Sequence, residues 1–282
     1  EFDNLITNAA LDKMAISTVS SLKTYAAVGT GSTAPSGGDT TLVAEISPSS
    51  SNRTNANGSV SETNTYVSGS PDYWERKTTY LFDFSQGNGN LTEIGLFSAV
   101  SSGTMWTRQL LKDSGGTPTT VTKTSSDQLR ITYTLQTYPP TSDTTATVTI
   151  SGTDYTITVR PNLVSGASQW GDFTADGPLN IGSGTSYKIS AAYSGAIGTR
   201  TGSPAGTGTA DSSRSIASYV SGNYYLDCTS IWSASVANYG AGGIPAVRTY
   251  GMSLDSPTNW SIFQLGISPF IPKDNTNQLT LV

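Results

Sequence analysis

Apolar and polar residues alternate with a period of two along most of this chain, which predicts strands rather than helices. The clearest case is residues 90–112, where two β-branched and aromatic stretches flank Ser101, Ser102 and Gly103. Small polar residues and glycine suit a tight reversal, so this segment is predicted to form a hairpin. Both faces of its first stretch are largely apolar, which favours a strand inside a packed domain over an exposed edge.

Further strands are predicted on both sides of this hairpin. The same alternation covers residues 23–28, 73–84, 121–124, 129–138, 187–193, 215–220, 224–233, 247–252, 260–265 and 278–282. Residues 146–159 are expected to form a second hairpin, in which Val148 and Ile150 of one arm match Tyr155, Ile157 and Val159 of the other.

Only the segment over residues 3–22 has helical periodicity. Its apolar residues recur at spacings of three and four, which predicts one amphipathic helix with a stripe made of Leu11, Met14, Ala15, Val19 and Leu22. Asp3 or Asn4 is expected to cap its first amides. The stripe requires cover, either from the sheet that follows or from a neighbouring subunit.

Between these elements lie segments rich in glycine, serine and asparagine. Residues 29–39 contain several glycines, but the Gly-Lys-Ser/Thr ending of a phosphate-binding loop is absent, so we expect a long flexible connection. Residues 47–58 are expected to be a mobile surface excursion, and residues 195–213 either a mobile or a contact loop. Pro139 and Pro140 cannot continue a ladder and mark the best domain boundary.

The predicted fold is therefore all-β with a short N-terminal helix. It comprises two β-sandwich-like domains, residues 1–140 led by the helix and residues 141–282. The chain has 282 residues, only 12% of them charged, and a net charge of −5. An acidic chain without basic clusters is a poor ligand for nucleic acid or an anionic membrane surface, and no stretch has the length and apolarity of a membrane span.

Residue types restrict the chemistry. The chain has no histidine and one cysteine, which excludes histidine-based triads and a conventional zinc site. Cys228 is expected to be a buried, inert thiol. We therefore expect no enzyme activity, cofactor or metal. Carboxylate chemistry of the kind that hydrolyses polysaccharides stays open as a rival, with the candidates Asp72, Glu75, Glu93, Asp172 and Asp176. For Glu93 we favour a structural role, bonded to a loop or to a neighbouring subunit.

Aromatic residues offer a second kind of site. Tyr73, Trp74 and Trp170 are candidates for glycan contact because aromatic rings stack on sugars. Trp106, Trp232 and Trp260 are expected to lie in the core.

Several short motifs occur in a fixed order in the N-terminal half. They are Leu-Ile-Thr-Asn-Ala-Ala-Leu-Asp-Lys-Met-Ala from Leu5, Tyr-Ala-Ala-Val-Gly-Thr-Gly-Ser-Thr-Ala-Pro from Tyr25, Asp-Thr-Thr-Leu-Val-Ala-Glu-Ile from Asp39 and Leu-Thr-Glu-Ile-Gly-Leu-Phe from Leu91. The series resembles the N-terminal attachment region of tailed-bacteriophage collar, tail-fibre and related virion appendage proteins. Residues 263–274 with 278–281 are similar to the ends of phage structural proteins.

This resemblance implies a structural component of the virion, in the collar, tail or baseplate. The implied attachment interface is Leu11, Met14, Val28, Thr30, Glu93, Ile94, Leu96 and Phe97. The implied partners are further copies of the chain in a cyclic homo-oligomer and other virion proteins of the neck, tail or baseplate. The alternatives are a module that binds host-surface glycan and a polysaccharide depolymerase.

Overall fold

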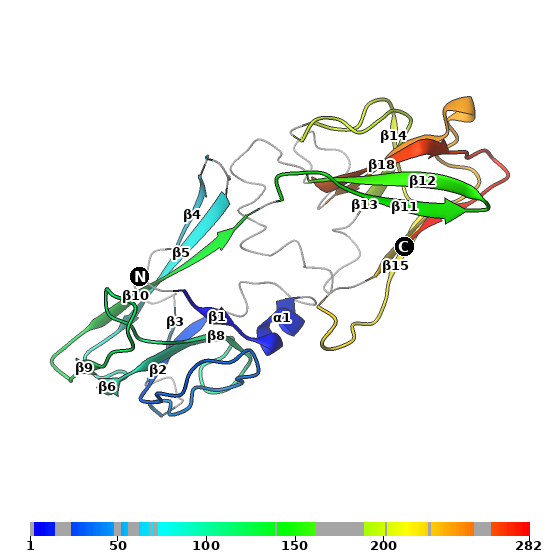
Figure 1. Ribbon diagram of the computed structural model, residues 1–282. Coiled ribbons are helices and arrows are strands. Elements are labelled where there is room, and N and C mark those ends of the chain that lie inside the picture. Colours follow the sequence, from blue (N-terminus) through cyan, green and yellow to red (C-terminus); the bar gives the residue numbers. More distant parts are fainter. Residues whose placement is uncertain are drawn as a thin grey trace.

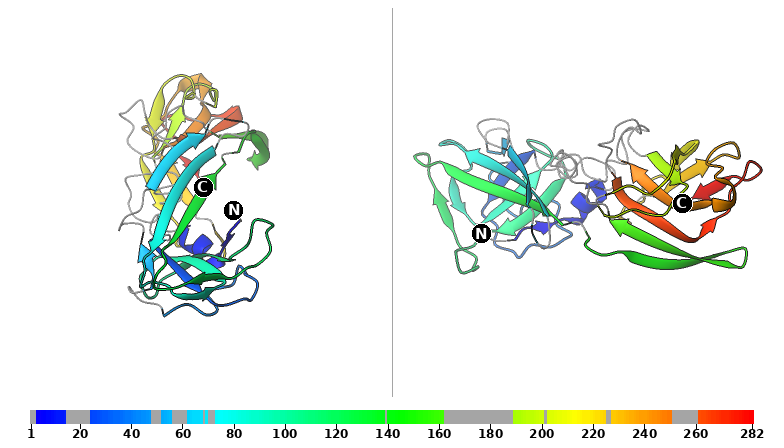
Figure 2. Two further views of the ribbon diagram at one scale, coloured as in Figure 1. Left: turned by 90° about the vertical axis from the view of Figure 1, so that its left-hand side faces the viewer. Right: turned by 90° about the horizontal axis from the view of Figure 1, so that it is seen from above.

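The structure is a computed structural model, and it describes residues 3–14, 24–47, 52–55, 62–67, 69, 73–138, 140–161, 189–200, 202–224, 227–250 and 261–282. These residues are mostly in β-strands, with one short α-helix, as the alternating pattern predicts. No described sheet combines strands from both sides of residue 140. The two groups of sheets lie at opposite ends of the molecule in Figure 1 and again in Figure 2.

Two facing sheets and a small ribbon make up the N-terminal group. The larger sheet has the order β1-β8-β7-β2-β3 and the smaller has the order β10-β5-β4, while β6 and β9 form the ribbon. Their bounds, together with the helix, are β1 Leu5–Ile6, α1 Asn8–Met14, β2 Tyr25–Gly29, β3 Thr54–Asn55, β4 Glu62–Val67, β5 Tyr73–Phe82, β6 Gly89–Leu91, β7 Glu93–Phe97, β8 Met105–Leu110, β9 Val121–Lys123 and β10 Leu129–Thr137.

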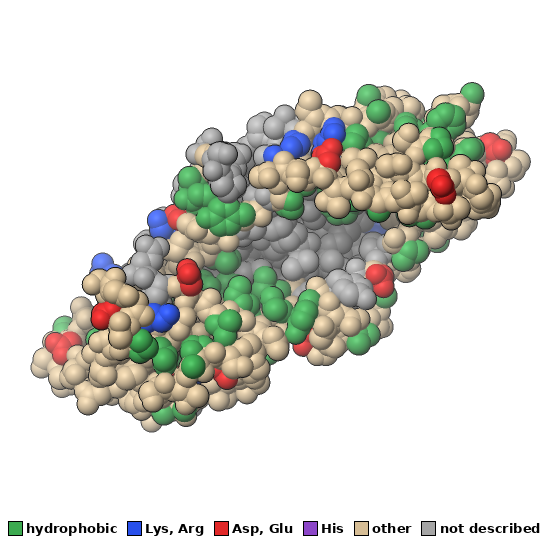
Figure 3. Space-filling model, in the orientation of Figure 1, with side chains coloured by type: hydrophobic (Ala, Val, Ile, Leu, Met, Phe, Trp, Pro, Cys, Tyr) green, Lys and Arg blue, Asp and Glu red, His purple; other side chains and the backbone are tan. Residues whose placement is uncertain are grey.

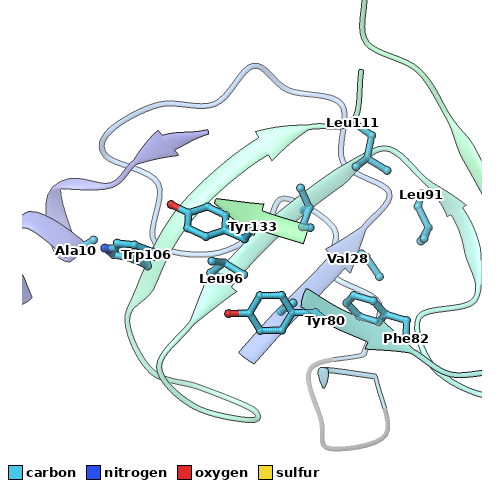
Figure 4. Packing of buried hydrophobic residues seen from close by; sticks show 11 residues of the cluster. Ala10, Val28, Tyr80, Phe82, Leu91, Leu96, Trp106, Leu111 and Tyr133 are labelled. Carbon is cyan, nitrogen blue, oxygen red and sulfur yellow. The ribbon is translucent and has the colours of Figure 1, made fainter. Parts of the chain in front are cut away.

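Side chains from both sheets meet in one core. Val28 and Leu96 from the larger sheet pack with Tyr80 and Phe82 of β5, as Figure 4 shows. Trp106 of β8 is fully buried, and its ring centroid lies 5.4 Å from that of Tyr133 on β10. The N-terminal group is therefore a β-sandwich, because alternate residues of each sheet point at the other sheet.

The predicted hairpin over residues 90–112 is confirmed. Strands β7 and β8 pair antiparallel, and Gly103 takes a positive φ of 90° in the reversal between them. Every residue of β7 is buried, as the two apolar faces predict. The first stretch is split, however, because residues Gly89–Leu91 leave this sheet and pair with β9 as the separate strand β6.

The helix is capped by a residue other than those predicted. Thr7 Oγ1 accepts a hydrogen bond from the Ala10 amide at 3.1 Å and donates one to the Met105 carbonyl at 2.5 Å. Thr7 therefore caps α1 and also bonds it to β8. The prediction that Asp3 or Asn4 caps the helix is wrong, because α1 begins at Asn8. The helical pattern beyond Met14 lies outside the described residues.

The C-terminal group also contains two facing sheets. A six-stranded sheet has the order β11-β12-β18-β17-β13-β14, and a three-stranded sheet has the order β15-β16-β19. Their bounds, with a short 3-10 helix, are β11 Thr144–Ile150, β12 Thr153–Pro161, β13 Ile189–Tyr193, β14 Gly208–Ala210, β15 Ser213–Ile216, β16 Cys228–Trp232, η2 Gly240–Gly242, β17 Ile244–Tyr250, β18 Ser261–Ile271 and β19 Leu279–Leu281.

The second predicted hairpin is also confirmed, since β11 pairs antiparallel with β12 and Val148 lies opposite Tyr155. Tyr155, Ile244 and Ile267 of the larger sheet share a core with the fully buried Trp232 of β16. Trp106 and Trp232 are thus core residues, as predicted, whereas Trp260 lies outside the described residues.

Candidate functional site

The motif series centres on Glu93, the first residue of β7. Its side chain is fully buried and accepts hydrogen bonds from three loop amides. Oε1 accepts from the amides of Gly31 at 3.1 Å and Ala44 at 2.8 Å, and Oε2 accepts from the amide of Val43 at 3.2 Å. The expected structural role of Glu93, bonded to a loop, is therefore confirmed.

Arg108 of β8 completes this group, and its side chain is also fully buried. Its Nε lies 2.8 Å from Glu93 Oε2, and its Nη1 lies 2.7 Å from Asp39 Oδ2. Nη2 donates to the Thr33 carbonyl at 2.7 Å, and Nη1 reaches the Ala34 carbonyl at 3.4 Å. We call Glu93, Arg108 and Asp39 the buried ion-pair cluster.

The charges of the cluster support one another. Burial by itself lowers the pKa of Arg108, but the hydrogen bonds and charges of Asp39 and Glu93 outweigh it and raise the pKa above its usual value. Burial likewise raises the pKa of Asp39, but the Ser36 amide and Arg108 outweigh that effect and hold the pKa below its usual range. Arg108 and Asp39 are thus held in their charged forms, which suits a structural ion pair.

The glycines of the loop are explained by the cluster. A methyl group added at Gly31 would lie 2.5 Å from Glu93 Oε1 and from Val43 Cβ, and one added at Gly29 would lie 2.6 Å from the same oxygen. Such distances are too short for carbon and oxygen, so the backbone needs glycine to approach the carboxylate. Residues 29–39 are therefore held in place at several points, and the predicted flexible connection is wrong.

A second buried arginine holds residues 52–55 against the β7–β8 turn. Arg53 is 4% exposed and bonds Glu45 through two nitrogens, at 2.6 and 2.8 Å. It also donates to the carbonyls of Ala99 at 2.7 Å and Ser102 at 2.9 Å, and its guanidinium lies 3.8 Å from the Phe97 ring centroid. The prediction of a mobile excursion over residues 47–58 is thus wrong for residues 52–55.

Most of the predicted attachment residues lie inside the protein. Five of the eight are buried and point into the sandwich or against the loop, namely Val28, Glu93, Ile94, Leu96 and Phe97. They fix the shape of the N-terminal group and, in this conformation, do not face a partner. Thr30 is exposed, and Leu11 and Met14 are half-buried. Met14, on α1, packs against the larger sheet of the same chain, and its sulfur lies 3.5 Å from Trp106 Nε1 of β8.

The predicted glycan residues are only partly described. Tyr73, at the start of β5, has its ring centroid 5.1 Å from that of Tyr138, which is half exposed. Tyr138 donates to Gln136 Oε1 at 2.8 Å, and Gln136 donates to Glu75 Oε2 at 3.0 Å. These four residues form the tyrosine patch. Only the backbone of Trp74 is described, within β5, and Trp170 lies outside the described residues.

The candidate carboxylates do not come together as a pair in the described structure. Glu93 is fully buried against Arg108, and Glu75 lies in the tyrosine patch, 2.6 Å from Lys77 Nζ. Asp72, Asp172 and Asp176 lie outside the described residues. Within the described part of the chain, no three histidine, cysteine or acidic residues gather in a way that would hold a metal ion.

Two buried lysines with matching roles were not predicted. Lys123 is 3% exposed and donates at 2.8 Å to the Asp83 carbonyl and to Asn88 Oδ1. Lys273 is equally buried and donates to Asn238 Oδ1 at 3.0 Å and to the Asn277 carbonyl at 2.9 Å. A signal was present in the sequence, because each lysine is followed four residues later by Asp or Asn, then Gln-Leu and a strand.

A search of protein-family models, curated proteins and solved structures finds no match to this chain. Among the helices that the structure describes, none is long and apolar enough to cross a membrane.

Proposed function

We propose that this chain is a structural component of a bacteriophage virion, in the collar, tail or baseplate, and that it acts by protein–protein assembly. The observation that carries the proposal is that three of the four motifs, those from Tyr25, Asp39 and Leu91, meet at one ion-pair cluster. Segments near Gly31, Val43, Glu93 and Arg108 lie far apart in the sequence, yet all bond within the buried ion-pair cluster. These three motifs therefore form one structural unit, which supports their interpretation as a module.

The surface supports the same proposal. Charged side chains are sparse on the face drawn in Figure 3, where a few basic and acidic ones adjoin among many polar and apolar side chains. A surface of this kind suits extensive hydrogen-bonded contacts between proteins, and repetition around a symmetric ring strengthens contacts that are individually weak.

The test is the mass of the purified protein in solution together with imaging of the isolated virion. We expect a multimer compatible with cyclic symmetry, and density for the chain at fixed symmetric positions on the neck, tail or baseplate. A strict monomer that is absent from the particle would contradict the proposal.

One observation favours binding of host-surface glycan as a second candidate. The tyrosine patch presents two aromatic rings beside an amide and a carboxylate, the groups that stack on sugar rings and bond their hydroxyls. We expect Tyr138→Ala to abolish saturable binding to host polysaccharide, while Tyr224→Ala, at an exposed tyrosine outside the patch, leaves binding unchanged. Equal binding by both variants would remove this candidate.

A further inference from the structure

Strand β11 is an exposed sheet edge. It is the outermost strand of the six-stranded sheet, bonded to β12 on one side, and all seven of its residues are exposed. Figure 1 shows it along the border of the C-terminal group. An edge strand presents unpaired backbone amides and carbonyls, which are ready to pair with another strand.

This edge lacks the usual protection against such pairing. Proteins normally protect edges with charged residues, proline, bulges or very short strands. Thr144–Ile150 contains only Thr, Ala, Val and Ile, and it pairs with β12 without a register shift. The other described edge strands are shorter or carry a charge, such as the three-residue β14 and β10 with Arg130.

The inner face of β11 is also apolar and uncovered. Ala146 and Val148 lie opposite Ile157 and Tyr155 of β12, and directly paired residues share a face of the sheet. Tyr155 is buried in the core, whereas Val148 is 46% and Ile150 is 48% exposed. The larger sheet therefore extends beyond the cover that the three-stranded sheet provides.

We propose that β11 pairs antiparallel with β11 of a second copy, about a two-fold axis at Thr147. Thr147 is the midpoint of the strand, so only this register pairs all seven residues. It places Thr145 opposite Thr149 and Ala146 opposite Val148, with no charge opposite another. It also joins the two apolar inner faces across the axis, because residues two apart point to the same side.

The flanking charges are compatible with this pairing. Asp143, the residue before β11, comes opposite Ser151 of the other copy and not opposite a second acid. It is already paired within its own chain, 2.6 Å from Arg160. A seven-residue edge is expected to bury less surface than the roughly 1,600 Å² that stable complexes bury. We therefore expect a weak dimer, whose fraction rises with protein concentration. The pairing itself is independent of the proposed function, and only its role in virion assembly rests on that proposal.

The test is sedimentation of the full chain over a range of concentrations. Thr147→Lys and Thr147→Glu each place two like charges directly across the axis, and we expect each to raise the dimer Kd at least about tenfold. Mixing the two variants opposes Lys to Glu, so the mixture is expected to dimerise again. Thr156→Lys, an exposed threonine of β12 opposite Thr147 within the chain, is the matched control and keeps dimerisation.

Three results in solution would overturn the inference. They are a wild type that is monomeric at every concentration, self-association that both Thr147 variants retain, and a mixture of the variants that stays monomeric. A result on the virion would also overturn it: a wild-type chain that is monomeric in solution but present in the virion, together with a Thr147→Lys variant that is absent from the virion. That result would favour pairing of β11 with a strand from another virion protein. Failure of the proposed function is distinguishable, because it is the absence of the wild-type chain from the particle.

Discussion

At the scale of single residues, the buried ion-pair cluster determines the shape of the N-terminal group. Glu93 accepts four hydrogen bonds, and Arg108 contacts two loop carbonyls and the carboxylates of Glu93 and Asp39. The side chains of Glu93 and Arg108 are fully buried, whereas that of Asp39 is partly exposed. A buried ion pair contributes little net stability relative to an apolar pair, but removal of one partner leaves a charge buried and unpaired.

We therefore expect Glu93→Gln to lower the free energy of unfolding by about 3–5 kcal/mol, because Arg108 then keeps a buried charge without its main partner. Chemical denaturation of the full chain measures the change. Asp143→Asn is the control, since it breaks the partly exposed pair with Arg160 and is expected to cost about 1 kcal/mol or less. Equal losses from the two variants would show that the cluster is not structurally important.

The sequence predicted part of this cluster. It indicated that Glu93 bonds to a loop, since a lone carboxylate in an apolar strand needs partners. It did not indicate that Arg108 bonds Glu93 across the hairpin and Asp39 from 69 positions away. It also did not indicate the reason for Gly29 and Gly31, which lies in the space around a carboxylate 62 or more positions away.

At the scale of elements, two buried lysines hold turns that lead into strands. Lys123 precedes β10 and Lys273 precedes β19, and each donates hydrogen bonds to oxygens of the turn that follows or packs against it. Burial lowers the pKa of both amino groups, which shows that the charged form is costly there. The hydrogen bonds to the turn compensate for that cost.

Replacement of Lys273 by Met keeps the buried stem but removes the donor. We expect Lys273→Met to destabilise the chain by about 1.5–3 kcal/mol, the usual contribution of hydrogen bonds that involve a charged group. Thermal unfolding measures the loss, and Lys13→Met on the half-buried last turn of α1 is a control expected to have little effect. A stabilising effect of Lys273→Met would mean that desolvation outweighs the hydrogen bonds.

At the scale of the whole molecule, Asp12 links the two groups of sheets. Its carboxylate, on α1, accepts hydrogen bonds from Tyr219, from Ser221 Oγ at 2.6 Å and from the Gly222 amide at 2.7 Å. The loop that carries these donors lies between β15 and β16, on the other side of residue 140. In Figure 1, α1 lies beside this loop.

This contact is expected to weaken in acid. The hydrogen bonds from Ser221, Tyr219 and Gly222 lower the pKa of Asp12 from its ordinary value of 3.8. A lowered carboxyl pKa means that the contact is fully present above the ordinary value and is lost as the pH falls through the folded pKa. Small-angle scattering at pH values from neutral down to below the folded pKa of Asp12 should therefore show greater separation of the two groups in acid.

Asp12→Asn at neutral pH separates this effect from general acid unfolding. We expect faster hydrogen exchange at Gly222 in Asp12→Asn than in wild type, because the amide loses a charged acceptor, while Lys13→Gln on the same helix leaves exchange unchanged. Unchanged exchange in Asp12→Asn would show that the contact does not hold the loop in solution.

The division into domains at residue 140 stays a prediction. In the described structure no sheet and no core cluster mixes residues from the two sides, in agreement with paired prolines at positions 139 and 140. The contacts of Asp12 nevertheless join the two sides, and nothing in the local pattern indicated them.

The sequence by itself determined the all-β class, the two hairpins and the core positions of Trp106 and Trp232. These follow from alternation with a period of two and from turn residues, both of which are local properties of the chain. Only the tertiary structure decided that the glycine-rich loop is hydrogen-bonded to Glu93 and Arg108, that most of the predicted attachment residues are buried and that β11 is an open edge. The physical reason is that burial, the approach of a backbone to a side chain and the position of a strand at an edge all depend on which distant segments lie side by side. The periodicity of a sequence does not specify those long-range contacts.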